Sequence, residues 1–168
     1  MVRWLQTSKI AQWLLLIVRL ILGYGWFTAG LFKLIGNFSV TGFINNGVMN
    51  PVLDPKGAPA YPWYTWLLEN VATPLTPFLN IAIPVAETAI GLALIIGSFT
   101  AVVAFIGLLL NFMFTLAGII AINPTYIFYG LIIFLAGYNA GFIGVDRFMP
   151  QFLGKYFRFF NYHPELKK

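Results

Sequence analysis

The chain contains no cysteine and only one histidine, His163, among its 168 residues. The lack of thiols excludes structural disulfides, cysteine-ligated iron–sulfur clusters and thiol catalysis within this chain. A membrane b-type haem usually takes two histidine ligands from helices, so a single histidine in the C-terminal tail argues against haem. The sequence also offers no metal-ligand cluster, phosphate-binding glycine loop or nucleophilic triad. Any electron transfer would therefore use a diffusible cofactor, such as a quinone, or a partner subunit.

Charged residues are scarce as well. Asp, Glu, Lys and Arg make up 9% of the chain, whereas hydrophobic residues make up 60%. A soluble domain carries roughly 25% charged residues. So few charges could not cover a globular surface in water, which disfavours one soluble domain with an unusually large core. The composition predicts a membrane protein with the lipid bilayer as its main partner.

Four apolar runs are each long enough to cross a membrane, since a helix needs about 20 residues to span a hydrocarbon core of ~30 Å. They cover residues 11–36, 78–97, 101–122 and 126–145. We expect an all-α membrane protein: a four-transmembrane-helix antiparallel bundle that forms one domain over residues 1–168. The connections after the second and third runs are very short, so the helices that they join are expected to be antiparallel neighbours.

Basic residues set the expected orientation. Arg3 and Lys9 precede the first run and five basic residues follow the fourth, whereas the loop 37–77 carries only Lys56. The positive-inside rule then predicts a multi-pass protein of the plasma membrane with both termini in the cytoplasm and the loop outside. In the tail 146–168 basic residues alternate with aromatic ones. This pattern favours a segment lying at the membrane interface over one that binds nucleic acid.

The external loop is rich in proline, with four prolines between residues 51 and 62. Most of it therefore cannot form regular helix. The stretch PWYTWLLENV at its later part is the exception, and we predict a short helix there. Its aromatic residues Trp63, Tyr64 and Trp66 are expected to act as anchors at the level of the lipid headgroups rather than as a ligand platform.

A guanidinium stands inside the otherwise apolar stretch LLLIVRLILGYG. At 3.6 residues per turn, one stripe of the first helix carries Arg19, Gly23, Trp26, Gly30 and Lys33. Small residues at a membrane helix interface let backbones approach closely. We therefore expect this stripe to face the other helices and to carry Arg19 inward.

Three further polar residues are expected at a similar depth in the membrane. They are Glu87, the only acid within the four runs, Asn111 and Asn139. An unpaired charge at mid-membrane costs roughly 2.5–3.5 kcal/mol, so we expect Arg19 and Glu87 to pair within one buried polar cluster. Such a pair serves either as a functional site or as a structural pin that fixes helix register. Both interpretations fit the sequence.

Several segments carry recognisable motifs. VRLILGYGWFTAGLFKL has the pattern R-x-x-x-G…G-x-x-K, and AETAIGLALIIGSFTAVVAFIG has the pattern E-x-x-x-G-x-x-L-x-x-G-x-x-T. Together with PWYTWLLENV and NPTYIFYGLIIFLAGYNAGFIGVDRF, they resemble the DoxX/DoxD family, in particular the DoxD-like subunit of thiosulfate:quinone oxidoreductase. The resemblance covers nearly the whole chain in order. It departs from the family at Ala101, where an arginine is frequent.

The resemblance implies a membrane oxidoreductase subunit that passes electrons from thiosulfate to membrane quinone, together with a small DoxA-like subunit. The positions that match the family motifs are Arg19, Gly23, Gly30, Lys33, Glu87, Gly91, Asn139 and Asp146. On this hypothesis the cofactor is a diffusible quinone, with no haem, iron–sulfur cluster or metal.

The expected site follows from this hypothesis and from the polar cluster. A quinone head would lie inside the bundle, and Glu87 would relay the proton that the quinone takes up on reduction. The expected catalytic residues are Arg19 and Glu87, the expected quinone-binding residues are Tyr24, Trp26, Asn111 and Asn139, and Lys33 is expected to contact the anionic substrate.

A non-enzymatic alternative also fits these residues. The chain could be a membrane scaffold or assembly partner for a redox protein, or a lipid-binding membrane protein, with the external loop as its docking surface. The sequence identifies neither the physiological electron donor nor the quinone type, the partner subunit or the oligomeric state.

Overall fold

The computed structural model describes residues 1–149, which form helices and no strand beyond one isolated bridge between Leu53 and Pro59. The expected interfacial part of the tail after residue 149, including His163, lies outside the described residues. The helices are α1 (Val2–Thr7), α2 (Lys9–Ile35), α3 (Thr41–Met49), α4 (Pro62–Leu67), a π-helical turn η1 (Leu68–Ala72), α5 (Thr76–Ile96), α6 (Thr100–Leu116), α7 (Asn123–Ala136), α8 (Tyr138–Gly141) and a 3₁₀ turn η2 (Val145–Arg147).

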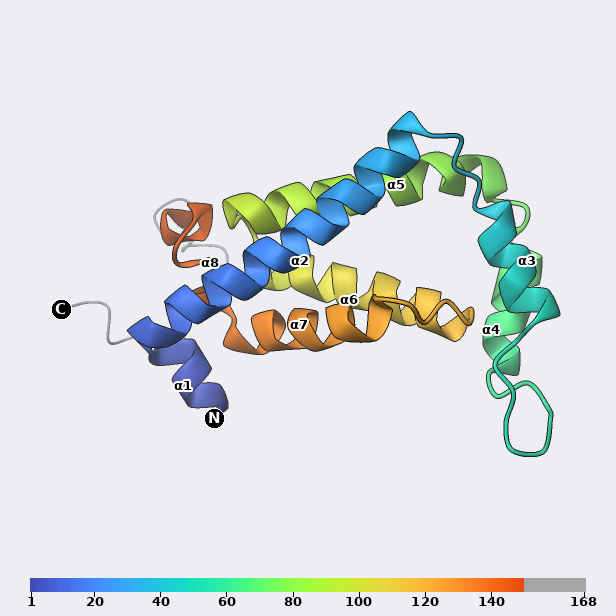
Figure 1. Ribbon diagram of the computed structural model, residues 1–168, viewed down its shortest axis with the longest axis horizontal. Coiled ribbons are helices and arrows are strands. Elements are labelled where there is room, and N and C mark those ends of the chain that lie inside the picture. Colours follow the sequence, from blue (N-terminus) through green and yellow to red (C-terminus); the bar gives the residue numbers. More distant parts are fainter. Residues whose placement is uncertain (150–168) are drawn as a thin grey trace.

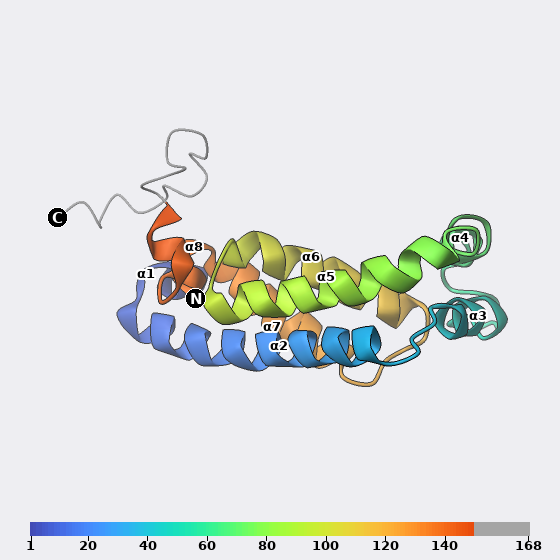
Figure 2. The ribbon, with the colours of Figure 1, turned by 90° about the horizontal axis from the view of Figure 1, so that it is seen from above.

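The four long helices α2, α5, α6 and α7 lie side by side along the molecule (Figure 1). Helices α1 and α8 lie at one end, which we call the N-terminal end, and α3 and α4 lie at the other, which we call the α3 end (Figures 1 and 2). The N-terminus and the last described residues share the N-terminal end. The long helices therefore traverse the length of the molecule an even number of times.

Two of the long helices, α2 and α5, are long and apolar enough to cross a membrane. They have 27 and 21 residues and mean hydropathies of 1.8 and 2.0. Helices α6 and α7 are shorter than the predicted third and fourth spans. The third predicted span loses its helical geometry after Leu116 because Gly118 (φ 81°) and Ala121 (φ 28°) adopt left-handed backbone conformations. The fourth ends at Ala136, before Gly137 (φ 59°).

The segment between α2 and α5 forms more helix than predicted. The short helix expected in PWYTWLLENV is confirmed as α4. Helix α3 was not expected. It can form because the prolines that argued against helix begin only after it, at Pro51. Tyr64 is not a headgroup anchor: it is 2% exposed, and its hydroxyl donates to the Met113 carbonyl at 2.6 Å. Burial raises the pKa of the Tyr64 phenol, which keeps this hydroxyl a donor. Trp63 and Trp66 are exposed.

Helices α2 and α5 pack closely through the predicted stripe of small residues. Gly23 and Gly30 on α2 and Gly91 on α5 are buried. A Cβ atom added at Gly91 would overlap backbone atoms of Phe27, and one added at Gly30 would overlap the backbone nitrogen of Thr88. The prediction that this stripe faces the other helices is therefore confirmed, and its contacts fix an antiparallel register between α2 and α5.

We expect Gly91→Ala to lower the free energy of unfolding by about 1–3 kcal/mol, because the methyl group forces two backbones apart. The matched control is Gly130→Ala, a buried glycine of α7 whose added Cβ would meet its nearest atoms at 3.7 Å, an ordinary contact. SDS-induced unfolding of the purified protein in detergent measures both. Equal stability of the two variants would contradict the close approach of α2 and α5.

Candidate functional site

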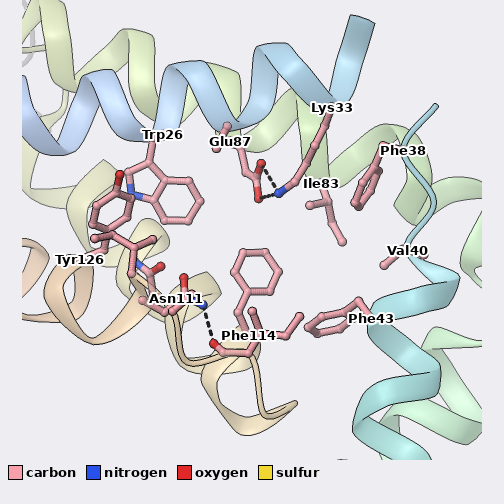
Figure 3. Close-up of a pocket in the computed structure, with 15 residues that line it drawn as sticks. Trp26, Lys33, Phe38, Val40, Phe43, Ile83, Glu87, Asn111, Phe114 and Tyr126 are labelled. Carbon is pink, nitrogen blue, oxygen red and sulfur yellow. Dashed lines mark hydrogen bonds and ion pairs between the residues drawn. The ribbon is translucent and has the colours of Figure 1, made fainter. Parts of the chain in front are cut away.

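Arg19 and Glu87 do not pair, so the prediction of one polar cluster around them is wrong. Glu87 accepts hydrogen bonds from the Lys33 ammonium on both carboxylate oxygens, at 2.5 and 2.6 Å (Figure 3). Arg19 lies about 21 Å from Lys33 along α2, toward the N-terminus of the helix, at a rise of 1.5 Å per residue. The antiparallel register places Gly30 beside Pro84 and Thr88, and this brings Glu87 to the last turns of α2.

Arg19 instead joins α2 to the segment that follows α7. It is 1% exposed, and its two terminal nitrogens donate to the carbonyls of Ala140 (3.0 Å) and Ile143 (2.7 Å). Asp146 supplies the nearby negative charge. The carboxylate of Asp146 also accepts hydrogen bonds from the backbone nitrogens of Phe99 (2.6 Å) and Thr100 (2.9 Å), at the start of α6. This arrangement is a structural clasp at the N-terminal end.

Two of the predicted quinone-binding residues lie away from any shared site. Asn139 sits at the N-terminal end, where its Oδ1 accepts from Gln12 (2.8 Å) and its Nδ2 donates to the carbonyls of Leu5 (2.6 Å) and Ser8 (3.2 Å). Its amide thus fastens α8 to α1 and α2. Tyr24 is 66% exposed on the outward face of α2.

The other predicted residues Trp26, Lys33, Glu87 and Asn111 meet at a cavity of about 300 Å³ near the α3 end (Figure 3). Helices α2, α5, α6 and α7 contribute to it, and the segment that leads into α3 covers it. Its lining comprises Trp26, Ala29, Lys33, Phe38, Val40, Phe43, Ile83, Glu87, Asn111, Phe114, Ile119, Ala121, Ile122, Asn123 and Tyr126. Five of these fifteen residues are aromatic and six are aliphatic, so the lining is mainly apolar with a few polar groups, as in sites that bind small organic molecules.

The amide of Asn111 is the least satisfied polar group of the cavity. Asn111 is 1% exposed, and its Oδ1 has no hydrogen-bond partner among the described residues. An unsatisfied buried acceptor costs about 1–3 kcal/mol. The second amide in the lining, Asn123, differs because it donates to the carbonyl of Ile119 at 2.7 Å. Asn111 therefore brings an unpaired acceptor into the wall of the cavity.

The charges of the cavity balance each other. The Lys33 ammonium pairs with Glu87 and lies 5.3 Å from the ring centre of Phe38 and 5.5 Å from that of Phe114. Lys33 thus presents no uncompensated positive charge to an anion. A neutral ring with polar substituents suits this lining better than an anion such as thiosulfate.

The sequence interpretation missed the aromatic lining and the partner of Glu87. Lys33 lies on the same helical stripe as Arg19, so the choice between the two cations depended on the register of α2 against α5. Phe38 and Phe43 come from the predicted loop and carried no signal of a site. Within residues 1–149, no group of three or more His, Cys, Asp or Glu side chains is placed to hold a metal ion.

Comparisons of the chain with protein-family models, curated proteins and solved structures give no match. The resemblance to the DoxX/DoxD family therefore stays a prediction carried by the quoted motifs.

Proposed function

We propose that the chain is a four-helix integral membrane protein whose cavity binds the head of a quinone, and that it serves as the quinone-reducing subunit of a membrane oxidoreductase. Thiosulfate or a similar reductant supplies the electrons. The observation that carries this proposal is the charge-balanced cavity, which is lined mainly by aliphatic and aromatic side chains and has an unsatisfied amide in its wall. The donor and a small DoxA-like partner subunit rest on the sequence resemblance alone.

The distribution of side chains supports a membrane location for all four long helices. Each helix buries polar or small residues and exposes large apolar ones, the reverse of a water-soluble surface. The exposed apolar residues include Ile17, Ile21, Phe32, Ile81, Val85, Leu92, Phe105, Leu109, Phe112, Phe128, Leu131 and Leu135. The basic residues Arg3, Lys9 and Arg147 belong to the N-terminal end, which agrees with cytoplasmic termini.

The lengths of α6 and α7 are compatible with this placement. They extend about 25 and 21 Å at 1.5 Å per residue, against ~30 Å for the hydrocarbon core. The irregular connection 117–122 completes the crossing. Non-helical backbone at membrane depth is tolerated where it lines a cavity, and residues 119, 121 and 122 of this connection do so.

The polar groups of the cavity match both oxidation states of a quinone. An asparagine side chain offers donors and an acceptor. The Asn111 amide can donate to a carbonyl oxygen of the oxidised ring, and its free Oδ1 can accept the hydroxyl of the reduced one. Trp26, Phe114 and Tyr126 provide aromatic surface for the ring.

Glu87 and Lys33 are the titratable pair of the cavity. Reduction of a quinone to a quinol takes up two electrons and two protons. We assign proton delivery to this pair: the Lys33 ammonium gives one proton to the reacting oxygen, and the Glu87 carboxylate relays the second proton after taking it up from solvent, since both groups must lie within hydrogen-bond reach of that oxygen. Arg19 has no part in this step, since it belongs to the clasp at the N-terminal end.

Thiosulfate-dependent reduction of decylubiquinone by the protein in lipid nanodiscs tests the proposed function. We expect turnover by the wild type and a loss of about tenfold or more in Glu87→Gln, in line with the contribution of a positioned proton donor. The control is Glu69→Gln, an exposed carboxylate. Unchanged turnover in Glu87→Gln would refute proton delivery, and quinone binding without turnover would assign the chain as a binding scaffold.

We expect Asn111→Leu to weaken decylubiquinone binding by about 3–10-fold, the equivalent of one hydrogen bond. Quenching of tryptophan emission reports binding because Trp26 lines the cavity. The matched control is Phe112→Leu, the next residue of α6, which is 45% exposed on the outward face. Equal affinities of the two variants would refute a role for the amide.

A further inference from the structure

We propose that the cavity opens sideways into the lipid beside the α6–α7 connection, so that its ligand is a membrane-dissolved molecule whose ring lies inside and whose apolar tail leaves past Ile119 and Ile122. This inference rests on the proposed function, because it adds an entry path and a tail to the quinone site.

The inner wall of the cavity is closed. Trp26, Val40, Glu87 and Asn111 are all 3% exposed or less. Val40 also belongs to a second core that packs α3 and α4 against the end of α6, with Ile44, Tyr64, Leu68 and Ala117 as its other buried members. This core closes the cavity toward the α3 end, where an aqueous entrance would otherwise lie.

The exposed part of the lining marks the opening. Ile119 is 37% exposed, Ile122 is 52% exposed, and Ala121 between them is exposed as well. Across from them on α2, the Lys33 side chain is 30% exposed. Apart from the Lys33 head, which pairs inward with Glu87, this rim is apolar. Such a rim suits a hydrocarbon chain rather than water.

The connection also begins short of the end of the long helix α5. Helices α5 and α6 meet at a tight turn at the N-terminal end and extend toward the α3 end. Their lengths are about 31 and 25 Å at 1.5 Å per residue. The connection after α6 therefore begins about 6 Å short of the far end of α5, within the apolar zone rather than beyond it.

The conformation of the connection is held in place. Ala121 has φ 28°, a left-handed value that is unfavourable for any residue with a Cβ. A strained backbone conformation persists only where contacts with the surrounding structure impose it. Asn46 donates to the Ala117 carbonyl at 2.9 Å and Asn123 donates to the Ile119 carbonyl at 2.7 Å. These two bonds hold the connection, which forms one side of the opening.

The test compares two probes on the protein in nanodiscs: decylubiquinone, and a tail-free benzoquinone with the same ring substituents. We expect Ile122→Gln to weaken decylubiquinone binding about tenfold, through lost apolar contact with the tail. Binding of the tail-free quinone should stay unchanged. The matched control is Ile120→Gln, which is 60% exposed but does not line the cavity. Ile122→Phe, which narrows the rim without adding polarity, should show the same selectivity.

The outcomes separate this inference from the proposed function. A loss confined to the tailed quinone and to position 122 supports the lateral opening. Equal losses for both quinones, or no loss in either variant at position 122, would overturn the lateral opening and leave the cavity as a quinone site. If the wild type binds neither probe, the proposed function fails and this inference fails with it.

Discussion

Replacing Lys33 with methionine is expected to lower the free energy of unfolding by about 3 kcal/mol, the lower end of the effect of removing one partner from a buried ion pair, because the Lys33 side chain is itself 30% exposed. Glu87 is 1% exposed, and Lys33 is the cation that neutralises it. Without Lys33 the carboxyl group would stay buried among aromatic rings without a counter-charge. SDS-induced unfolding of the purified protein in detergent measures this effect.

The double variant Lys33→Met, Glu87→Met provides the control. Replacing a buried ion pair by apolar residues of similar volume is often neutral or stabilising. We therefore expect the double variant to recover most of the lost stability while lacking quinone reduction. That combination would separate the structural role of the pair from its role in proton delivery. A double variant as unstable as Lys33→Met would contradict the pairing.

Arg19→Met is expected to lower the free energy of unfolding by about 3–5 kcal/mol, because it removes two charge-assisted hydrogen bonds and the cation near Asp146. The carbonyls of Ala140 and Ile143 would lose their donors. The same unfolding measurement applies. Arg19→Lys should recover only part of the loss, since a single ammonium does not reproduce the planar fork of a guanidinium.

Quinone affinity distinguishes the clasp at Arg19 from the cavity. Arg19 lies about 21 Å from Lys33 along α2, so folded Arg19→Lys protein in nanodiscs should bind decylubiquinone as tightly as the wild type. Weaker binding by this variant at unchanged stability would instead support the sequence-based prediction that Arg19 belongs to the quinone site.

The sequence predicted the helical architecture well where local pattern decides it. The small-residue stripe of α2 faces α5 as expected, and α4 forms where the proline-rich loop permits it. The partner of Arg19 could not be predicted in the same way. The depth of a residue along its helix restricts which charges can meet. The register between α2 and α5 then decides which of them pair. The backbone carbonyls after α7, which accept hydrogen bonds from Arg19, leave no trace in side-chain patterns.

The cavity could not be predicted from the sequence either, because it depends on the backbone conformation of the α6–α7 connection. Hydropathy stays high through residues 117–122, so the third run reads as one continuous span. Two left-handed residues end α6 early, and the irregular backbone that follows lines the cavity. The rings of Phe38 and Phe43 then cover it from a segment that was predicted to be an external loop. Trp26, Glu87 and Asn111 were expected to share one site and do so, whereas Lys33 was not expected beside Glu87.

Photoaffinity labelling with an azidoquinone in nanodiscs, followed by peptide mass spectrometry, tests the central claim most directly. We expect saturable labelling of the cavity segments, residues 26–43 and 111–126, and we expect excess decylubiquinone to abolish it. Labelling concentrated around Arg19 and Asn139 at the N-terminal end, or labelling that excess decylubiquinone leaves unchanged, would contradict a quinone site in the cavity.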